Sequence, residues 1–192
     1  MNPTLKTALK IIGGLVAVVV VLLFIMRYNT KAHSPEDTVQ FESDGLKLEV
    51  LYSRPYKKDR EIFGALVPYD EVWRTGANEA TTFETNKDIL VDGSLLKAGK
   101  YTLWTIPGEK SWKVIFNSQM YPWGIDVEKK AYRDPEYDTL VIETAVNKIE
   151  NYVEQFTIFF EEINDLVFLF LSWDDTSVSL PIKEAEGLEI PE

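Results

Sequence analysis

The chain has no cysteine and a single histidine, His33, among its 192 residues. Without cysteine it can form no disulfide, no thiolate metal site and no cysteine nucleophile. One histidine cannot build a multi-histidine zinc site, and it could complete a Ser-His-Asp triad only by folding back onto the domain. We interpret His33 as a solvated linker residue. Any chemistry would fall to Asp, Glu, Lys, Arg, Tyr, Ser or Thr, and we expect neither a metal nor a cofactor.

Positive charge is also scarce, because 20 Lys and Arg stand against 31 Asp and Glu, a net charge of −11. The first 26 residues hold two of the bases and none of the acids. Residues 27–192 therefore carry 18 bases against 31 acids, a net charge of −13. Such a surface repels phosphate backbones, so we expect no nucleic-acid partner.

The chain does have one long apolar run, residues 11–26 (IIGGLVAVVVVLLFIM). Counted from residue 8, it would span about 28 Å as a helix, close to the roughly 30 Å hydrocarbon core of a bilayer. The alternative is a cleavable signal peptide, whose apolar region usually has about 7–15 residues. Arg27 and Lys31, directly after the run, favour an uncleaved anchor. Three positive charges precede the run, Lys6, Lys10 and the α-amino group, and two follow it, Arg27 and Lys31. Because the more positive side of a membrane helix tends to stay in the cytoplasm, this difference of one charge predicts that the soluble part is extracytoplasmic.

Strand patterns dominate beyond the linker. Residues 46–50 (LKLEV) alternate apolar and polar side chains, and they follow Asp44-Gly45, a hairpin signal that makes residues 38–41 the expected partner strand. Further strands are expected at 80–85, 89–91, 101–106, 112–117, 139–145, 155–160, 166–173 and 177–182, with turns at Asp92-Gly93, Pro107-Gly108 and Asp174-Asp175. Strands at this spacing predict an all-β, antiparallel sandwich or barrel-like domain.

Two segments interrupt the strands. Residues 59–67 (DREIFGALV) are expected to form one helical turn with Ile62, Phe63 and Leu66 directed inward. Residues 119–137 form a connection of unusual length, which is often functional, although a short helix at 127–132 is the alternative. The predicted organisation is a tail (1–7), a transmembrane helix (8–26), a polar linker (27–37), the β domain (38–185) and a C-terminal tail (186–192).

Arginine is clustered. Three of the five arginines, Arg54, Arg60 and Arg74, lie within 21 residues, together with the aromatic residues Tyr52, Tyr56, Tyr69 and Trp73. Arginine binds carboxylate or phosphate through a planar, permanently charged fork. One interpretation is a pocket for an anionic or sugar-like ligand. The other is an internal ion-pair network in which Arg60 and Arg74 pair with acids such as Glu61, Asp70 or Glu79.

Carboxylate chemistry has weaker support. Glycoside hydrolysis needs two carboxylates about 5–9.5 Å apart, and with 31 acids some pair meets that condition by chance. A hydrolase using Glu79 is therefore the less favoured hypothesis. Asp134 and Asp138 could contribute to a Ca²⁺ site, but their spacing matches no loop motif, and a solvated acidic loop is the simpler interpretation.

Several motifs are similar to a known family. The segments YSRP (52–55), IFG (62–64), VPY (67–69), WRTGANEAT (73–81), AGKYTLWTIP (98–107) and Trp123-Gly124 resemble the blocks of the bacterial domain-of-unknown-function family 2911. The resemblance covers about residues 35–183. It implies an exported or envelope-associated domain, but no catalytic assignment. It also marks recurring positions: Tyr52, Arg54, Arg60, Trp73, Arg74, Gly76, Asn78 and Glu79.

The sequence thus predicts a bacterial, single-pass membrane protein with a periplasmic domain of the cell envelope. The leading hypothesis is a binding module for a small anion or a glycan, because an Arg/aromatic cluster on loops of a rigid β scaffold is a usual layout for recognition. The candidate ligand-binding residues are Tyr52, Arg54, Arg60, Tyr69, Trp73, Arg74, Asn78, Glu79 and Trp123. The alternative is a structural protein that docks an envelope partner, and an enzyme is not the favoured interpretation.

Overall fold

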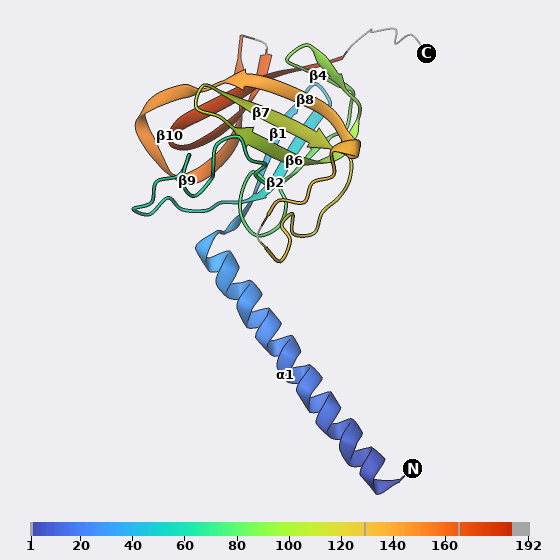
Figure 1. The fold of residues 1–192 in the computed structure, drawn as a ribbon. Coiled ribbons are helices and arrows are strands. Elements are labelled where there is room, and N and C mark those ends of the chain that lie inside the picture. Colours follow the sequence, from blue (N-terminus) through green and yellow to red (C-terminus); the bar gives the residue numbers. More distant parts are fainter. Residues whose placement is uncertain (1, 129, 165, 186–192) are drawn as a thin grey trace.

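The computed structural model describes residues 2–128, 130–164 and 166–185. It consists of one long N-terminal helix and a β domain of two antiparallel sheets (Figure 1). The expected fold class, an all-β sandwich preceded by a single apolar helix, is confirmed. The C-terminal tail expected at 186–192 lies outside the described residues.

The six-stranded sheet has the order β1-β2-β3-β6-β7-β8 and the four-stranded sheet the order β5-β4-β10-β9. The first comprises β1 (Glu36–Ser43), β2 (Leu46–Ser53), β3 (Thr82–Thr85), β6 (Gly99–Pro107), β7 (Ser111–Asn117) and β8 (Asp138–Ala145). The second comprises β4 (Ile89–Val91), β5 (Ser94–Leu96), β9 (Asn147–Ile163) and β10 (Leu166–Glu184). A 3-10 helix, η1 (Pro135–Tyr137), precedes β8. At their margins β1 lies near β9, and β8 lies near β5 and β10, so the sandwich is partly closed like a barrel.

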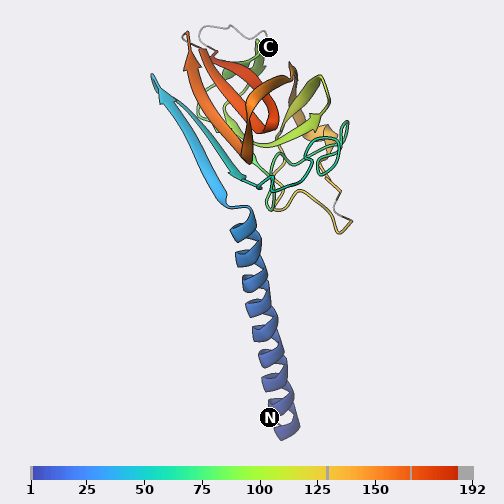
Figure 2. The same ribbon diagram turned by 90° about the vertical axis from the view of Figure 1, so that its left-hand side faces the viewer.

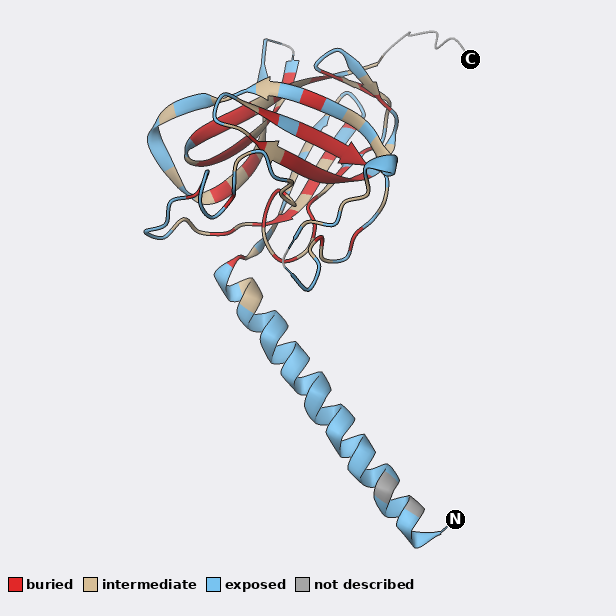
Figure 3. Cartoon of the chain, viewed as in Figure 1, coloured by how far each residue is buried: buried red, intermediate tan, exposed pale blue. Residues whose placement is uncertain are grey.

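Alternation of side chains explains how the strands pack. In β2 the apolar side chains of Leu46, Leu48, Val50 and Tyr52 are buried, while the intervening residues are exposed or half-buried. Figure 3 shows that buried residues gather in the β domain, whereas α1 is exposed along most of its length. The largest fully buried side chains between the sheets include Trp112, Trp173, Phe83, Phe116 and Phe156. Such a core of interlocking aromatic and branched side chains holds the two sheets together through the burial of apolar surface.

A second, smaller cluster lies on the outer face of the six-stranded sheet. Trp104 on β6 and Ile115 on β7 pack there with Tyr121 from the long connection before β8, and with Ala80. The rings of Trp104 and Tyr121 meet edge to face at 5.2 Å. This cluster fastens the connection to the sheet, so the loop has a defined position without regular secondary structure of its own over most of its length.

The helix α1 (Pro3–His33) is longer than the apolar run. It includes residues 27–33, which the sequence analysis assigned to the linker, and it ends immediately before Ser34-Pro35, where proline disfavours helix. Its apolar side chains between Leu9 and Met26 are exposed, and the stretch Leu9–His33 is long and apolar enough to cross a membrane. A membrane anchor and a signal sequence both fit this description.

Two local expectations are wrong. Residues 59–67 form turns and a bridge between Phe63 and Val67 instead of a helical turn, and the side chain of Leu66 is exposed instead of inward. Gly64, at φ +91°, takes a left-handed conformation that a helix cannot continue through, and a Cβ there would lie only 2.8 Å from the Tyr69 ring.

The expected turn at Asp174-Asp175 is also wrong, because both residues lie inside the continuous strand β10, at register shifts against β9. Asp174 has φ +55°. Aspartate tolerates a positive φ, and this conformation occurs in β-bulges as well as in turns. The strand β5, which the sequence analysis did not identify, pairs with β4 through the Asp92-Gly93 hairpin.

Candidate ligand-binding site

The segment before β3 is fixed to the sheet by its backbone. Trp73 and Thr105 of β6 exchange hydrogen bonds of 2.7 and 2.9 Å between their backbone groups. The Trp73 side chain turns into the core, where it stacks on Trp173 at 5.9 Å, and its indole N–H donates to the carbonyl of Gly76 (3.0 Å). Trp73 therefore holds its own loop in place.

The turn that follows has unusual backbone geometry. Thr75 and Asn78 both have φ of 56°, and Gly76 has φ +151°. A Cβ at Gly76 would lie 2.8 Å from the backbone oxygen of Ser53, so no other residue fits there without displacement of β2. A left-handed β-branched residue such as Thr75 costs on the order of 1–3 kcal/mol. Its carbonyl accepts a 2.7 Å hydrogen bond from the buried hydroxyl of Thr81, which helps to hold this conformation.

Asn78 and Glu79 join the domain to α1. The side-chain amide of Asn78 donates to the carbonyls of Ser34 (3.1 Å) and Thr30 (3.4 Å) at the end of the helix. The Thr30 carbonyl also accepts the backbone N–H of Ser34. Glu79 Oε1 lies 2.8 Å from Arg27 Nη2 and 3.7 Å from Lys31 Nζ. Both Glu79 oxygens are buried and accept no aligned hydrogen bond. We therefore interpret the contact as an attraction between charges and not as a directed bond.

Arg74 is in a different situation. Its Nε and Nη1 are buried, and among the described residues they have no hydrogen-bond partner. Burial lowers the pKa of Arg74 from its ordinary value, while the charge of Glu79 opposes that shift. Because a guanidinium stays charged at neutral pH, the lowered pKa reflects an uncompensated cost of desolvation. The sequence left open whether Glu79 would pair with Arg74, and the structure pairs Glu79 with Arg27 and Lys31 instead.

Arg74 lines a cavity of about 950 Å³. Its walls come from the end of α1, the loops around residues 55–77, the connection near residues 125–131, and Trp173 of β10. Figures 1 and 2 show that these loops lie at the end of the domain to which α1 is connected. Among the described residues, the charged ones in the lining are Lys58, Arg60, Arg74 and Lys130 and one carboxylate, Glu71. Lys130 is also paired with the exposed Glu128 at 3.1 Å. The lining is therefore cationic in a chain whose net charge is −11.

Gly124 allows the connection to approach Arg74. With φ +81°, a Cβ there would stand 3.1 Å from the Trp104 ring, 3.2 Å from the Ala80 methyl group and 3.3 Å from the Arg74 Cβ. The missing side chain thus lets the backbone of the connection pack directly against the Arg74 stem. This close packing places the neighbouring Ile125 in the cavity wall.

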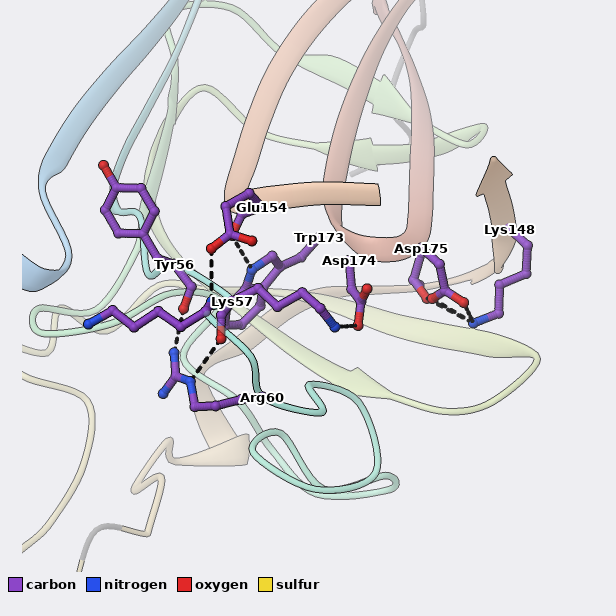
Figure 4. A network of polar contacts seen from close by, with 10 residues as sticks. Tyr56, Lys57, Arg60, Lys148, Glu154, Trp173, Asp174 and Asp175 are labelled. Atoms are coloured by element: carbon purple, nitrogen blue, oxygen red, sulfur yellow. Dashed lines mark hydrogen bonds and ion pairs between the residues drawn. The ribbon is translucent and has the colours of Figure 1, made fainter. Parts of the chain in front are cut away.

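The loop that carries Lys58 and Arg60 is tied to the four-stranded sheet (Figure 4). The backbone N–H of Lys58 donates to Glu154 Oε1 (2.8 Å), and the ammonium group of Lys57 pairs with Asp174 at the bulge of β10. The Arg60 guanidinium donates to the carbonyls of Lys57 (3.0 Å) and Tyr56. Within the part of the chain that the structure describes, no carboxylate pairs with Arg60, so its charge is free to act on the cavity.

Three of the nine candidate residues line the cavity: Arg60, Trp73 and Arg74. Six do not. Arg54 donates to Asp37 Oδ2 (3.0 Å), the Phe156 carbonyl (3.2 Å) and the Thr157 hydroxyl (2.9 Å), and Tyr52 is buried with its hydroxyl on the backbone of Ile158. Tyr69 packs against the core, Asn78 and Glu79 contact α1, and Trp123 is half-buried in the connection.

Other residues that line the cavity were not among the predicted candidates. They include His33 and Ser34 at the end of α1, Lys58, Glu71 and Lys130 among the charged residues, and Leu66, Val72 and Ile125 among the apolar ones. His33 had been interpreted as a solvated linker residue. The neighbouring lysines at 57–58 and 129–130 were a signal for positive charge in these loops, but nothing in their spacing indicated that the loops meet.

The fold and the site define a β-sandwich domain on an apolar helix, with a cationic cavity at the junction. A family model described as a protein of unknown function, DUF2911, matches residues 34–182. The chain belongs to this family, as the motifs around Trp73 to Thr81 indicated. No match was found among the curated proteins or among the solved structures.

Proposed function

We propose that this protein is a membrane-anchored binding module that holds an anionic ligand in the cavity beside α1. The observation that carries the proposal is the Arg74 guanidinium, whose Nε and Nη1 are buried without a partner among the described residues. A buried, unpaired charge is costly to keep, and an anion in the cavity would satisfy it. Lys58 and Arg60 line the same walls without a carboxylate partner among the described residues, and Lys130, which pairs with Glu128 at the surface, lines them as well. These cations support an anion over a neutral glycan.

The membrane and envelope parts of the proposal rest on the helix. Seen in isolation, its exposed apolar side chains would be unfavourable in water, and an uncleaved anchor removes that cost. Glu79 contacts Arg27 and Lys31, and Asn78 contacts the carbonyl of Thr30. These contacts would be lost from a product cleaved after residue 32. We place the domain on the extracytoplasmic side of a bacterial envelope, in keeping with the charge bias across the apolar run.

The alternatives have less support. Docking by strand addition would use a sheet edge. The edge strands β1 and β8 each lie near strands of the other sheet, which restricts access to them. Glycoside hydrolysis uses two carboxylates, and among the described residues the cavity is lined by one, Glu71, while Glu79 pairs with the helix. Neither strand addition nor glycoside hydrolysis accounts for the buried charge of Arg74.

The proposal is tested with the full chain in nanodiscs, by calorimetric titration of inorganic phosphate, citrate and an uncharged disaccharide. An anion present at 100 times its Kd would raise the free energy of unfolding by about 2.7 kcal/mol. At about 2–4 °C per kcal/mol, that corresponds to a rise in Tm of about 5–11 °C. Arg74→Met should abolish both the heat of anion binding and the rise in Tm. Lys113→Met, which replaces an exposed lysine on β7 outside the cavity, should preserve both. Binding that survives in Arg74→Met would contradict the assignment of this site.

A further inference from the structure

The cavity adjoins the membrane-facing end of the molecule. His33, the last residue of α1, and Ser34 are part of its wall. The apolar run ends at Met26, and α1 continues for seven residues from Arg27 to His33. At 1.5 Å per residue this adds about 10 Å to the helix. The head-group layer on each side of a bilayer is about 5–8 Å thick, so the cavity lies at or just above the head groups of the adjoining leaflet.

The cavity wall has two chemical characters. Lys58, Arg60, Arg74 and Lys130 supply positive charge, while Leu66, Val67, Val72, Ile125 and Ala131 supply apolar surface. Leu66 is 44% exposed although it lies beside the buried residue Val67, so its side chain is available to a ligand. A small inorganic anion would use only the charged part of such a wall. A ligand with an anionic group and an adjoining apolar portion would use both.

The size of the cavity favours the same kind of ligand. Its volume of about 950 Å³ is at the upper end of the range for ligand pockets and far exceeds the need of a single inorganic ion. The basic side chains come from three segments, the loop with Lys58 and Arg60, the loop with Arg74 and the connection with Lys130, so the positive charge is spread over different walls of the cavity. This arrangement suits an extended head group better than a small compact anion.

On this basis, and resting on the proposed function, we infer that the cavity binds the phosphate-bearing head group of an anionic lipid from the leaflet next to α1. Arg74 and its cationic neighbours receive the phosphate. The surface around Leu66 and Val72 covers the carbon atoms of the glycerol portion that adjoins the phosphate. Anchoring by α1 keeps the cavity at the height at which such a head group lies, so a modest intrinsic affinity suffices because the lipid is concentrated in the same plane.

The test uses the full chain in nanodiscs of phosphatidylcholine with and without 10% phosphatidylglycerol. Native mass spectrometry after release into mild detergent counts the lipids that remain bound. We expect phosphatidylglycerol to be retained about tenfold beyond its share of the bilayer, a difference of about 1.4 kcal/mol. In parallel, inorganic phosphate and glycerophosphoglycerol, the soluble head group, are titrated into the phosphatidylcholine nanodiscs by calorimetry.

Variants separate the two parts of the wall. Arg74→Met and, independently, the exposed Lys130→Met should reduce lipid retention, and Lys113→Met should not. Leu66→Ser should weaken retention of the lipid while leaving any binding of inorganic phosphate unchanged. Because Leu66 and Lys130 are exposed, these two variants are expected to fold even if Arg74→Met does not.

Each outcome decides between the two proposals. Selective retention that falls in the cavity variants supports the lipid. If inorganic phosphate or glycerophosphoglycerol binds as tightly as the lipid and Leu66→Ser has no effect, the lipid assignment is overturned while the anion site stands. If neither lipids nor any soluble anion binds, both proposals are overturned.

Discussion

Replacement of Arg74 by methionine should stabilise the empty protein. Two buried donor atoms of the guanidinium lack partners among the described residues, and a buried polar group without a partner costs about 1–3 kcal/mol. The attraction to Glu79 works in the opposite direction. Because the pKa of Arg74 is lowered, the desolvation cost exceeds that attraction. Methionine has a similar length and no charge, so we expect a gain of about 1–2 kcal/mol in the free energy of unfolding.

The control is Arg54→Met. Arg54 lies near Arg74 in sequence, but its guanidinium is bonded to Asp37, the carbonyl of Phe156 and the hydroxyl of Thr157. Its loss breaks three hydrogen bonds to a charged group, and after a discount for partial exposure we expect a destabilisation of about 1–3 kcal/mol. The two arginine variants should therefore change stability in opposite directions.

The assay is thermal unfolding of the full chain in detergent micelles, in a chloride buffer free of phosphate and carboxylates. Arg74→Met should raise Tm by about 2–8 °C and Arg54→Met should lower it. Addition of a bound anion should raise the Tm of the wild type and leave that of Arg74→Met unchanged. If Arg74 were instead part of an internal ion pair, its loss would cost about 3–5 kcal/mol, and a fall of that size would refute the reasoning.

Two further predictions concern the scaffold of the site. Gly76→Ala should destabilise the domain by about 3 kcal/mol or more, because its Cβ would meet the Ser53 backbone at a φ that alanine disfavours, whereas Gly93→Ala, at φ +79° in open space, should cost only about 1 kcal/mol. Urea midpoints compare the two, and equal losses would show that the close contact has no effect. Burial raises the pKa of Tyr52, so its contribution to stability is complete below the ordinary tyrosine pKa of about 10 and is lost as the pH rises through the raised value. Tyr52→Phe should remove this alkaline loss, and urea unfolding at pH 8 and pH 11 measures it; an alkaline loss of equal size in the variant would assign the titration to another group.

Most of the strands were predictable because their signal is local. The buried and exposed residues of β2 alternate with a period of two, and Asp44-Gly45 supplies a turn of positive φ between β1 and β2. The wrong predictions concern segments whose local sequence pattern is compatible with two different structures. Aspartate at positive φ forms the bulge of β10 as readily as a turn, and the apolar residues of 59–67 suggested a helical turn that Gly64 does not allow.

The candidate site was predicted only in part, since charge partners are long-range. Arg60, Trp73 and Arg74 were identified and line the cavity. Asn78 and Glu79 lie in the same motif, but they contact the end of α1, more than 40 residues earlier in the chain. Lys130 reaches the cavity because the connection before β8 packs on Trp104 of β6 through its own Tyr121, a contact that no spacing of residues indicates.

By itself, the sequence determined that this is a β domain behind one apolar helix, without cysteine chemistry or a multi-histidine site, and that it belongs to the DUF2911 family. These properties follow from composition, from the period of apolar residues and from contiguous motifs. Only the tertiary structure decided which of the clustered arginines is already neutralised. Arg54 is bonded within the fold, whereas two nitrogens of Arg74 are buried without a partner among the described residues. The physical reason is that the environment of a charge depends on which distant segments the fold brings against it, and residue type and spacing do not specify that arrangement.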